Sequence, residues 1–146
     1  MSKTPKAAQN PLILILLGWL VPGAGYLLLD RNHWRRGLLF MVVIHLTFIF
    51  GILLHGGVLT MSWNMRDPSF SIVNGLTFVI QLGAGWMAWI SLLAYSAGWE
   101  WLAANDSHAY YELGSFYCLV AGALNYFVVC HSLDRSRKHA FEMIEE

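Results

Sequence analysis

Two histidines, His55 and His131, are the side chains whose type and spacing come closest to a cofactor site. Each lies eighteen residues beyond the start of a long apolar segment, at Gly37 and Leu113 respectively. On two helices that start at the same face of a membrane, this spacing places both imidazoles at one depth, as the axial ligands of a haem require. The alternative is two interfacial histidines in contact with headgroups and water. Because no further motif supports a cofactor or a metal, we expect none, and haem b stays a third hypothesis.

Catalytic chemistry has one candidate segment, which brings two acids, a serine and a histidine together in sequence: Asp106, Ser107, His108 and Glu112. A catalytic triad needs side chains that converge in space, and sequence neighbours do not provide that arrangement. The sequence also contains no nucleophile motif, phosphate-binding loop or metal signature. We therefore predict that the protein is not an enzyme.

A helix break is predicted at Pro22, Gly23 and Gly25, inside the first apolar segment. Proline removes a backbone donor and glycine loosens the turn, so that carbonyl groups are freed there. Such breaks line substrate sites in transporters, whereas elsewhere they only let a neighbouring helix approach closely. Because one break is recognised without a matching second one, packing is the favoured interpretation.

Polar and small residues indicate how the helices pack. Gln81 and Asn125 lie at equal distances from the ends of their segments, so their amides are expected to form a hydrogen bond within the membrane. Gly114, Cys118 and Gly122 recur every four residues and form a ridge of small residues on one face of a helix. Such a ridge lets helix backbones approach closely, either inside the protein or against a partner.

The composition indicates the environment of the chain. Of 146 residues, 57% are hydrophobic and 12% are charged, whereas soluble domains have about 45–50% and about 25%. A soluble fold of this size cannot bury so much apolar surface, so a soluble enzyme is excluded. Nine basic residues balance nine acidic ones, and without a net positive field we expect no nucleic-acid partner. We predict one integral membrane domain, residues 1–146.

Four uncharged stretches are long enough to cross a bilayer, which takes about 20 apolar residues. Backbone groups in lipid must be satisfied within the protein, and continuous apolar runs favour helices over a barrel. We therefore predict an all-α bundle of four transmembrane helices, the first kinked at Pro22. The helices are expected near residues 11–29, 37–55, 73–98 and 113–133, followed by a short cytoplasmic tail, residues 134–146.

Orientation follows from positive charges, which concentrate in cytoplasmic segments. Four full spans place six lysines and arginines on the side of both termini and three on the other side, so both termini are predicted in the cytoplasm. The three are Arg31, Arg35 and Arg36, and we expect them to contact lipid phosphates or an acidic partner. If the first segment is instead re-entrant at Pro22, the count becomes five against four, which gives no preference.

Two blocks of the sequence resemble known families. The segment Pro22-Gly23-Ala24-Gly25-Tyr26 resembles the Pro-Gly-x-Gly-aromatic signature of small two-transmembrane-segment domains. The C-terminal block, with Ala121-Gly122-x-Leu124-Asn125, resembles an uncharacterised family of small bacterial membrane proteins, a domain of unknown function. This resemblance implies four spans in a bacterial inner membrane and implies no reaction. The chain departs from that family at His131-Ser132, where the family ends its last helix with an Asp-Ala pair.

The sequence therefore predicts a non-catalytic accessory, assembly or scaffold subunit. Its expected partners are membrane lipids and other membrane protein subunits or a second copy of the chain. The alternative is a small oligomeric transporter or lipid-binding protein that uses the helix break at residues 22–25.

Overall fold

The computed structural model describes residues 10–29, 34–58, 71–99, 105 and 107–145. Within these ranges the chain is helical, without strands, which confirms the predicted all-α class. The helices in chain order are α1 (Pro11–Leu20), α2 (Ala24–Leu29), α3 (Trp34–Leu53), α4 (Ile72–Leu82), α5 (Trp86–Ser96) and α6 (Tyr111–Glu145).

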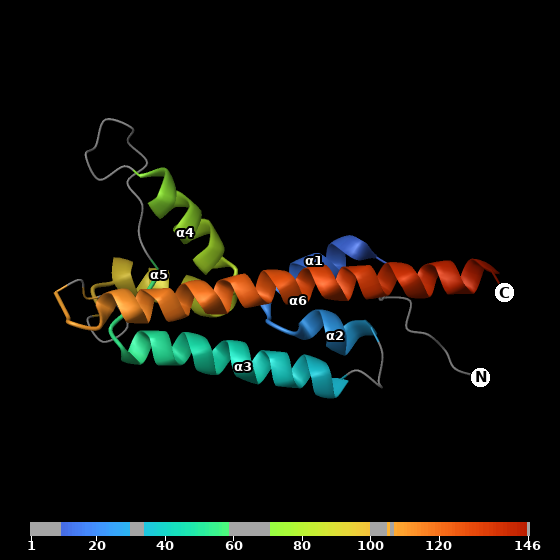
Figure 1. The fold of residues 1–146 in the computed structure, drawn as a ribbon, viewed down its shortest axis with the longest axis horizontal. Coiled ribbons are helices and arrows are strands. Elements are labelled where there is room, and N and C mark those ends of the chain that lie inside the picture. Colours follow the sequence, from blue (N-terminus) through green and yellow to red (C-terminus); the bar gives the residue numbers. More distant parts are fainter. Residues whose placement is uncertain (1–9, 30–33, 59–70, 100–104, 106, 146) are drawn as a thin grey trace.

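The longest helix, α6, forms the axis of the molecule, and α3 runs antiparallel beside it (Figure 1). A Cβ added to Gly114 would lie 2.6 Å from the carbonyl oxygen of Gly51, so the two backbones touch there. Among the described residues, two stretches are long and apolar enough to cross a membrane, Trp34–Leu53 and Tyr111–Lys138. By length and composition, these two helices favour association with a membrane.

The first apolar segment folds back on itself. After α1 the chain turns at residues 21–23, and α2 returns toward the end from which α1 came (Figure 1). A Cβ added to Gly18 would lie 3.6 Å from the backbone nitrogen of Gly25, whereas seven residues of continuous helix span about 10 Å. Gly23 has a φ of 81°, a left-handed conformation that favours glycine. The segment is a helical hairpin, and the prediction of one kinked helix over residues 11–29 is wrong.

The third apolar segment is interrupted in the same way. α4 ends at Leu82 and α5 begins at Trp86, with a turn at residues 83–85 between them. Gly85 has a φ of 70°, so the turn again contains a left-handed glycine. α4 approaches α6 at its C-terminal end and tilts away toward its beginning (Figure 1). The prediction of one continuous helix over residues 73–98 is therefore wrong.

The two hairpins approach from opposite ends of α6 (Figure 1). The α1–α2 hairpin comes from the end where α3 begins and α6 finishes. We call it the basic end, because it carries all the lysines and arginines whose side chains the structure describes: Arg35, Arg36, Arg135, Arg137 and Lys138. The α4–α5 hairpin comes from the other end, which we call the histidine end after His55 and His108. α1, α4 and α5 have 10, 11 and 11 residues, so each is about 15–17 Å long, half of the roughly 30 Å hydrocarbon core of a bilayer.

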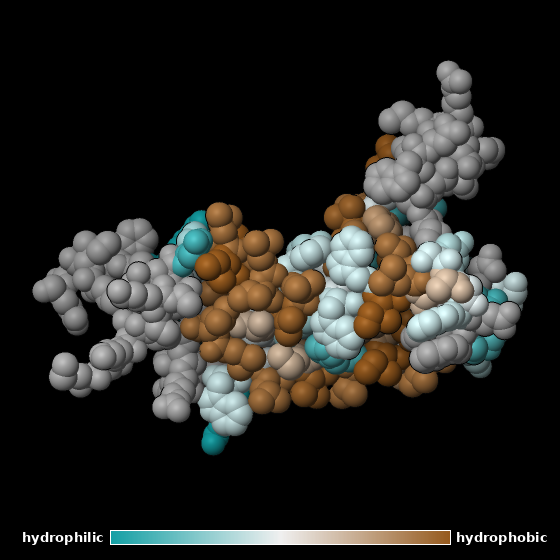
Figure 2. Space-filling view, turned by 180° about the vertical axis from the view of Figure 1, so that it is seen from behind, coloured by the Kyte–Doolittle hydropathy of each residue, from teal (hydrophilic) through white to brown (hydrophobic). Residues whose placement is uncertain are grey.

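Small and apolar side chains fill the interior around α6. Ala84, Ala88, Cys118 and Ala121 are fully buried, and Ile44 of α3 is 1% exposed. Large apolar side chains instead cover much of the outside, as Figure 2 shows for one face. In lipid the hydrophobic effect does not hold helices together, so close packing of small residues must do so. This arrangement therefore suits a membrane environment.

Candidate functional site

Asn125, in the middle of α6, joins the two hairpins. Its side-chain nitrogen Nδ2 lies 3.2 Å from the carbonyl oxygen of Gly18 and 3.1 Å from that of Trp19, both in α1. The same nitrogen donates to the carbonyl oxygen of Gly83, at the end of α4, over 2.8 Å. The residue is 0% exposed. One buried amide thus holds both helix breaks against α6.

The turns of the two hairpins also touch each other directly. A Cβ added to Gly85 would lie 2.7 Å from the carbonyl oxygen of Trp19, and it would also meet the carbonyl oxygen of Leu20. Real side chains do not approach a backbone oxygen so closely, so only glycine fits at this position. The end of α1 and the beginning of α5 therefore meet at the level of Asn125, which we call the hairpin junction.

The break at Pro22 explains why carbonyl groups are available at the hairpin junction. The last carbonyls of any helix lack partners from the next turn, and Pro22 has no N–H to offer. The N–H of Val21 still donates to the carbonyl of Leu17 over 2.9 Å. The carbonyls of Gly18 and Trp19 come next in the chain, and Asn125 donates to them.

The oxygen Oδ1 of Asn125 is buried and has no hydrogen-bond partner in the described part of the chain. A buried acceptor without a partner costs about 1–3 kcal/mol, and native proteins satisfy almost all such atoms. The hairpin junction therefore has an unused acceptor beside several backbone oxygens. These oxygens suit a small group that donates hydrogen bonds or carries positive charge.

A second hydrogen-bonded pair lies beside the hairpin junction. Nε1 of Trp86, the first residue of α5, donates to Nε2 of His45 in α3 over 3.1 Å. Nδ1 of His45 lies 2.7 Å from the carbonyl oxygen of Met41. Both ring nitrogens are satisfied when the proton is on Nδ1, an assignment that follows from the hydrogen-bond network. His45 therefore connects α5 to α3.

Gln81 and Asn125 do not form the hydrogen bond expected between them. The side-chain nitrogen of Gln81 donates to the carbonyl oxygens of Gly57, at 3.2 Å, and Ser115, at 3.1 Å. That of Asn125 donates to carbonyls of the hairpin turns. Each amide instead donates to backbone carbonyls of other segments.

The ridge of Gly114, Cys118 and Gly122 is buried on α6 and contacts two different elements. Gly114 lies against α3 near Gly51, and Cys118 Sγ lies 4.0 Å from the carbonyl oxygen of Phe48 in the same helix. A Cβ on Gly122 would collide with the carbonyl oxygen of Ile80 at the end of α4. Whether the ridge also serves a partner protein stays a prediction.

The histidine pair expected at one depth is separated by the whole length of the bundle. The ring of His55 lies 3.9 Å from that of His108 at the histidine end, whereas His131 lies 5.9 Å from the ring of Tyr26 toward the basic end. The expectation of equal depth is wrong because the α4–α5 segment turns back instead of crossing, so that α6 begins at the end where α3 finishes. Among the described residues, no group of three His, Cys, Asp or Glu side chains could hold a metal ion.

The arginines of the second segment lie elsewhere than expected. Arg35 and Arg36 share the basic end with Arg135, whereas the predicted topology placed them on opposite sides. Arg31 lies outside the described residues.

In the candidate catalytic segment, Asp106 also lies outside the described residues. His108 accepts a hydrogen bond from the N–H of Tyr110 over 3.3 Å, through its Nδ1.

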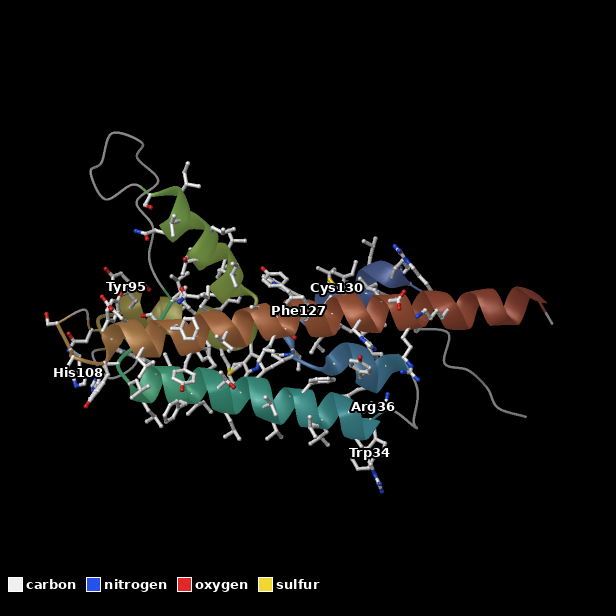
Figure 3. The ribbon with its side chains drawn as sticks, viewed as in Figure 1. Trp34, Arg36, Tyr95, His108, Phe127 and Cys130 are labelled. Atoms are coloured by element: carbon white, nitrogen blue, oxygen red, sulfur yellow. The ribbon has the colours of Figure 1, made fainter. Side chains whose placement is uncertain are left out.

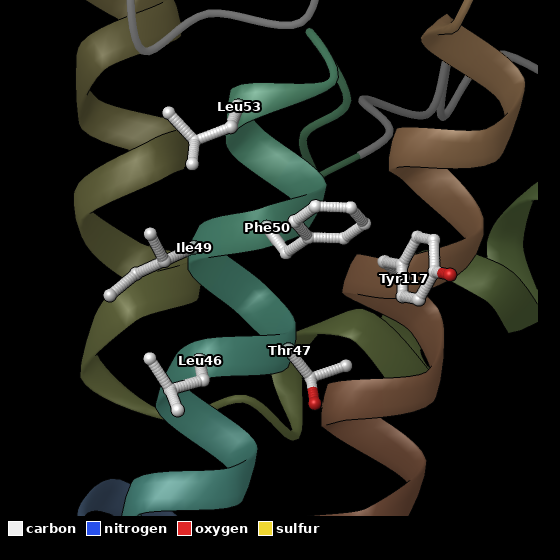
Figure 4. Close-up of a pocket in the computed structure, with 6 residues that line it drawn as sticks. All are labelled: Leu46, Thr47, Ile49, Phe50, Leu53 and Tyr117. Atoms are coloured by element: carbon white, nitrogen blue, oxygen red, sulfur yellow. The ribbon is translucent and has the colours of Figure 1, made fainter.

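A groove between α3 and α6 offers no further chemistry. The hydroxyl of Thr47 already donates to the carbonyl of Val43 in the same helix over 2.8 Å. The rings of Phe50 and Tyr117 meet edge to face, 5.0 Å apart. The residues that line the groove (Figure 4) are Leu46, Thr47, Ile49, Phe50, Leu53 and Tyr117. This surface suits hydrocarbon chains.

The second helix break was missed in the sequence, although a signal for it is present. Gly83-Ala84-Gly85-Trp86 repeats the pattern Gly-Ala-Gly-aromatic of Gly23-Ala24-Gly25-Tyr26. Each copy begins in the turn of a hairpin, and a long helix follows each hairpin, α3 after the first and α6 after the second. The chain is thus two units of the same kind, a hairpin followed by a long helix, which run in opposite directions.

In the ranges that the structure describes, the fold and the hairpin junction define a helical protein with two helices able to cross a membrane and two interrupted helical segments that meet between them. The chain belongs to a family of unknown function (DUF6677), whose sequence pattern matches residues 13–141. No curated protein and no solved structure matches it.

Proposed function

We propose that the protein lies in a bacterial inner membrane, with α3 and α6 as complete spans and the two hairpins entering from opposite faces. This arrangement replaces four complete spans by two spans and two re-entrant segments. Both termini and the α2–α3 connection then share one side. The lysines and arginines that adjoin this side in sequence are Lys3, Lys6, Arg31, Arg35, Arg36, Arg135, Arg137 and Lys138.

Only Arg66, among the nine lysines and arginines of the chain, adjoins the other side. Positive residues accumulate in cytoplasmic segments, so a ratio of eight to one assigns both termini to the cytoplasm. The ratio was six to three for four complete spans. The two-hairpin topology therefore agrees much better with the charge distribution.

The function that this geometry supports best is transport of a small solute through the hairpin junction. Secondary transporters are commonly built from two repeats of opposite orientation, and their sites lie near the midplane where interrupted helices meet. The transport proposal rests on the contact of both helix breaks with Asn125. The Oδ1 atom of this residue is buried and has no partner in the described part of the chain. The matching second break also removes the argument that favoured simple packing.

The chemistry of the hairpin junction indicates the class of solute. Three carbonyl oxygens surround Nδ2 of Asn125 at 2.8–3.2 Å, a distance that suits an N–H donor. Rings of backbone carbonyls also replace the hydration shell of monovalent cations in channels. We therefore assign a small monovalent cation, ammonium or potassium, as the solute. It would bind between the three carbonyl oxygens when the Asn125 side chain turns away. One chain of 146 residues is too small to enclose a path, so we expect an oligomer.

Flux measurements on proteoliposomes test this proposal. Vesicles that contain the wild-type protein should take up ammonium or potassium faster than empty vesicles, and Asn125→Leu should abolish the difference. Cys130→Ser, which changes an exposed residue of the same helix, is the control and should keep the flux. A wild-type flux equal to that of empty vesicles for both ions would overturn the transport proposal.

A second candidate is the non-catalytic accessory or scaffold subunit, which one observation favours. The hairpin junction is tightly packed, since the backbone of Gly122 lies directly against the carbonyl of Ile80 and Ala84 is 0% exposed. A photo-crosslinking residue in place of Phe127, which is 74% exposed on α6, tests for a partner. A scaffold gives one discrete protein adduct in native membranes, whereas a lipid-facing position gives lipid adducts alone.

A further inference from the structure

The basic end contains a second group of polar side chains, centred on Tyr26 of α2. Its side chain is 2% exposed. Its ring centroid lies 5.9 Å from that of His131 on α6 and 5.6 Å from that of Phe40 on α3. A Cβ on Gly37 would lie 2.9 Å from the Cβ of Tyr26, so α2 also touches the α3 backbone. Tyr26 is therefore held between the two long helices.

Two guanidinium groups are charged neighbours of the Tyr26 hydroxyl, those of Arg36 and Arg135. Arg36 comes directly before Gly37, which contacts Tyr26. Arg135 follows His131 by four residues, so the two lie on one face of α6. Figure 3 shows Arg36 at the beginning of α3, near Trp34. Two positive charges from different helices thus lie near one tyrosine.

Neither arginine forms an ion pair among the described residues. Lys138 forms an ion pair with Asp134 at 3.0 Å. The carboxylate of Asp134, which directly precedes Arg135 in the chain, is therefore already paired. The first turn of α3 contains no acid. The positive end of a helix dipole favours anions and disfavours cations such as Arg36. Among the described residues, this end therefore holds more positive than negative charge, and Arg36 and Arg135 lie there without an ion pair.

We propose that Arg36, Arg135 and Tyr26 bind the phosphate group of an anionic phospholipid. Guanidinium groups pair with phosphate through two parallel hydrogen bonds, and the tyrosine hydroxyl donates a third. Trp34 is 48% exposed, two residues from Arg36, and tryptophan is enriched at the level of lipid headgroups. Free phosphate has the same chemistry, but Leu39, 60% exposed on the next turn of α3, provides a surface for acyl chains. The proposal does not depend on transport.

Native mass spectrometry of the protein in a neutral detergent tests the proposal. The purified chain is mixed with equal amounts of phosphatidylglycerol and phosphatidylcholine of the same chain length. The wild-type protein should retain phosphatidylglycerol over phosphatidylcholine by about tenfold, because both lipids have the phosphate but only phosphatidylcholine adds a quaternary ammonium group, which the two guanidinium groups repel. The variant R36Q/R135Q should show a ratio near one.

The control variant R137Q/K138Q removes the same charge from the same end and should keep the wild-type ratio. An equal loss in R36Q/R135Q and in the control would mean unspecific attraction and would overturn the proposal, as would a wild-type ratio near one. If R36Q/R135Q does not fold, Tyr26→Phe decides, because it keeps the ring contacts and removes one donor. An unchanged amount of retained phosphatidylglycerol in Tyr26→Phe would then overturn the proposal.

Inorganic phosphate without lipid distinguishes the two sources of the anion. A lipid site should keep its phosphatidylglycerol when millimolar phosphate is added, since the acyl chains contribute to binding. If phosphate displaces the lipid and raises the melting temperature of the wild-type protein by itself, the ligand is a soluble anion, and the lipid proposal fails.

Discussion

Asn125 and Gly83 are joined by a hydrogen bond of 2.8 Å from the side-chain nitrogen Nδ2 to the carbonyl oxygen. Asn125 belongs to α6 and Gly83 to the turn of the second hairpin, so the bond lies within the second unit of the chain. Because the same nitrogen also reaches Gly18 and Trp19, the bond connects both hairpins through one side chain. The stability of the hairpin junction therefore depends on this amide.

Replacement of Asn125 by alanine should destabilise the protein by about 1–2 kcal/mol, because three carbonyls lose their donor in a buried site. The melting temperature in detergent, followed by size-exclusion chromatography, measures the loss. Asn74→Ala is the control, since Asn74 is an exposed asparagine of α4. Equal melting temperatures for the wild type and Asn125→Ala would contradict a structural role of the amide.

Cysteine labelling distinguishes two hairpins from four complete spans. In a Cys130→Ser background, where Cys118 is buried, His55→Cys should react with an impermeant maleimide added outside intact cells. Arg36→Cys should react only after the membrane is opened, because the basic end faces the cytoplasm. Four complete spans place these two positions on the reverse sides. The reverse labelling pattern would therefore exclude the re-entrant first segment.

Gly122→Leu should lower the yield of folded protein, because any Cβ at this position meets the carbonyl of Ile80. In a Cys130→Leu background Cys118 is the remaining thiol, and it is 0% exposed. Separation of α4 from α6 should make this thiol reactive. Cys130→Leu alone adds bulk on the exposed face of the same helix and should change neither yield nor reactivity. An unreactive Cys118 at full yield would mean that the ridge tolerates bulk.

The hydrogen bond from Trp86 to His45 should stabilise the attachment of α5 to α3. A double-mutant cycle with His45→Phe and Trp86→Phe should give a coupling energy of about 0.6 kcal/mol, and at most about 1.7. Trp89→Phe replaces a tryptophan that is 43% exposed on the same helix, so it should show no coupling to His45→Phe. A coupling of zero for Trp86 would mean that the bond does not contribute.

The helical class and the break at residue 22 follow from local chemistry, which is why the sequence predicted them. An uncharged apolar stretch must satisfy its backbone internally, and Pro22 removes a donor wherever the chain goes. The buried ridge on α6 also follows from a spacing of four, which places small residues on one face. Such properties depend on neighbours within a few positions.

The second break at residues 83–85 could have been recognised, because it repeats Gly-Ala-Gly-aromatic. Glycine alone only permits a turn, however, and does not require one. The left-handed φ of Gly85 becomes favourable where its Cα packs on the carbonyls of Trp19 and Leu20. A contact between segments so distant in the chain cannot be read from local pattern.

The sequence by itself determined the apolar helices, the first break and the small residues that allow close packing. Only the tertiary structure decided that the chain reverses at Gly23 and again at Gly85. The second reversal makes α6 antiparallel to α3, so that Arg36 and Arg135 share one end and His55 lies far from His131. The physical reason is that a helix break allows the following segment to run in several directions and does not determine which one it takes. The direction is chosen by distant contacts, above all by the carbonyls that Asn125 gathers from both hairpins.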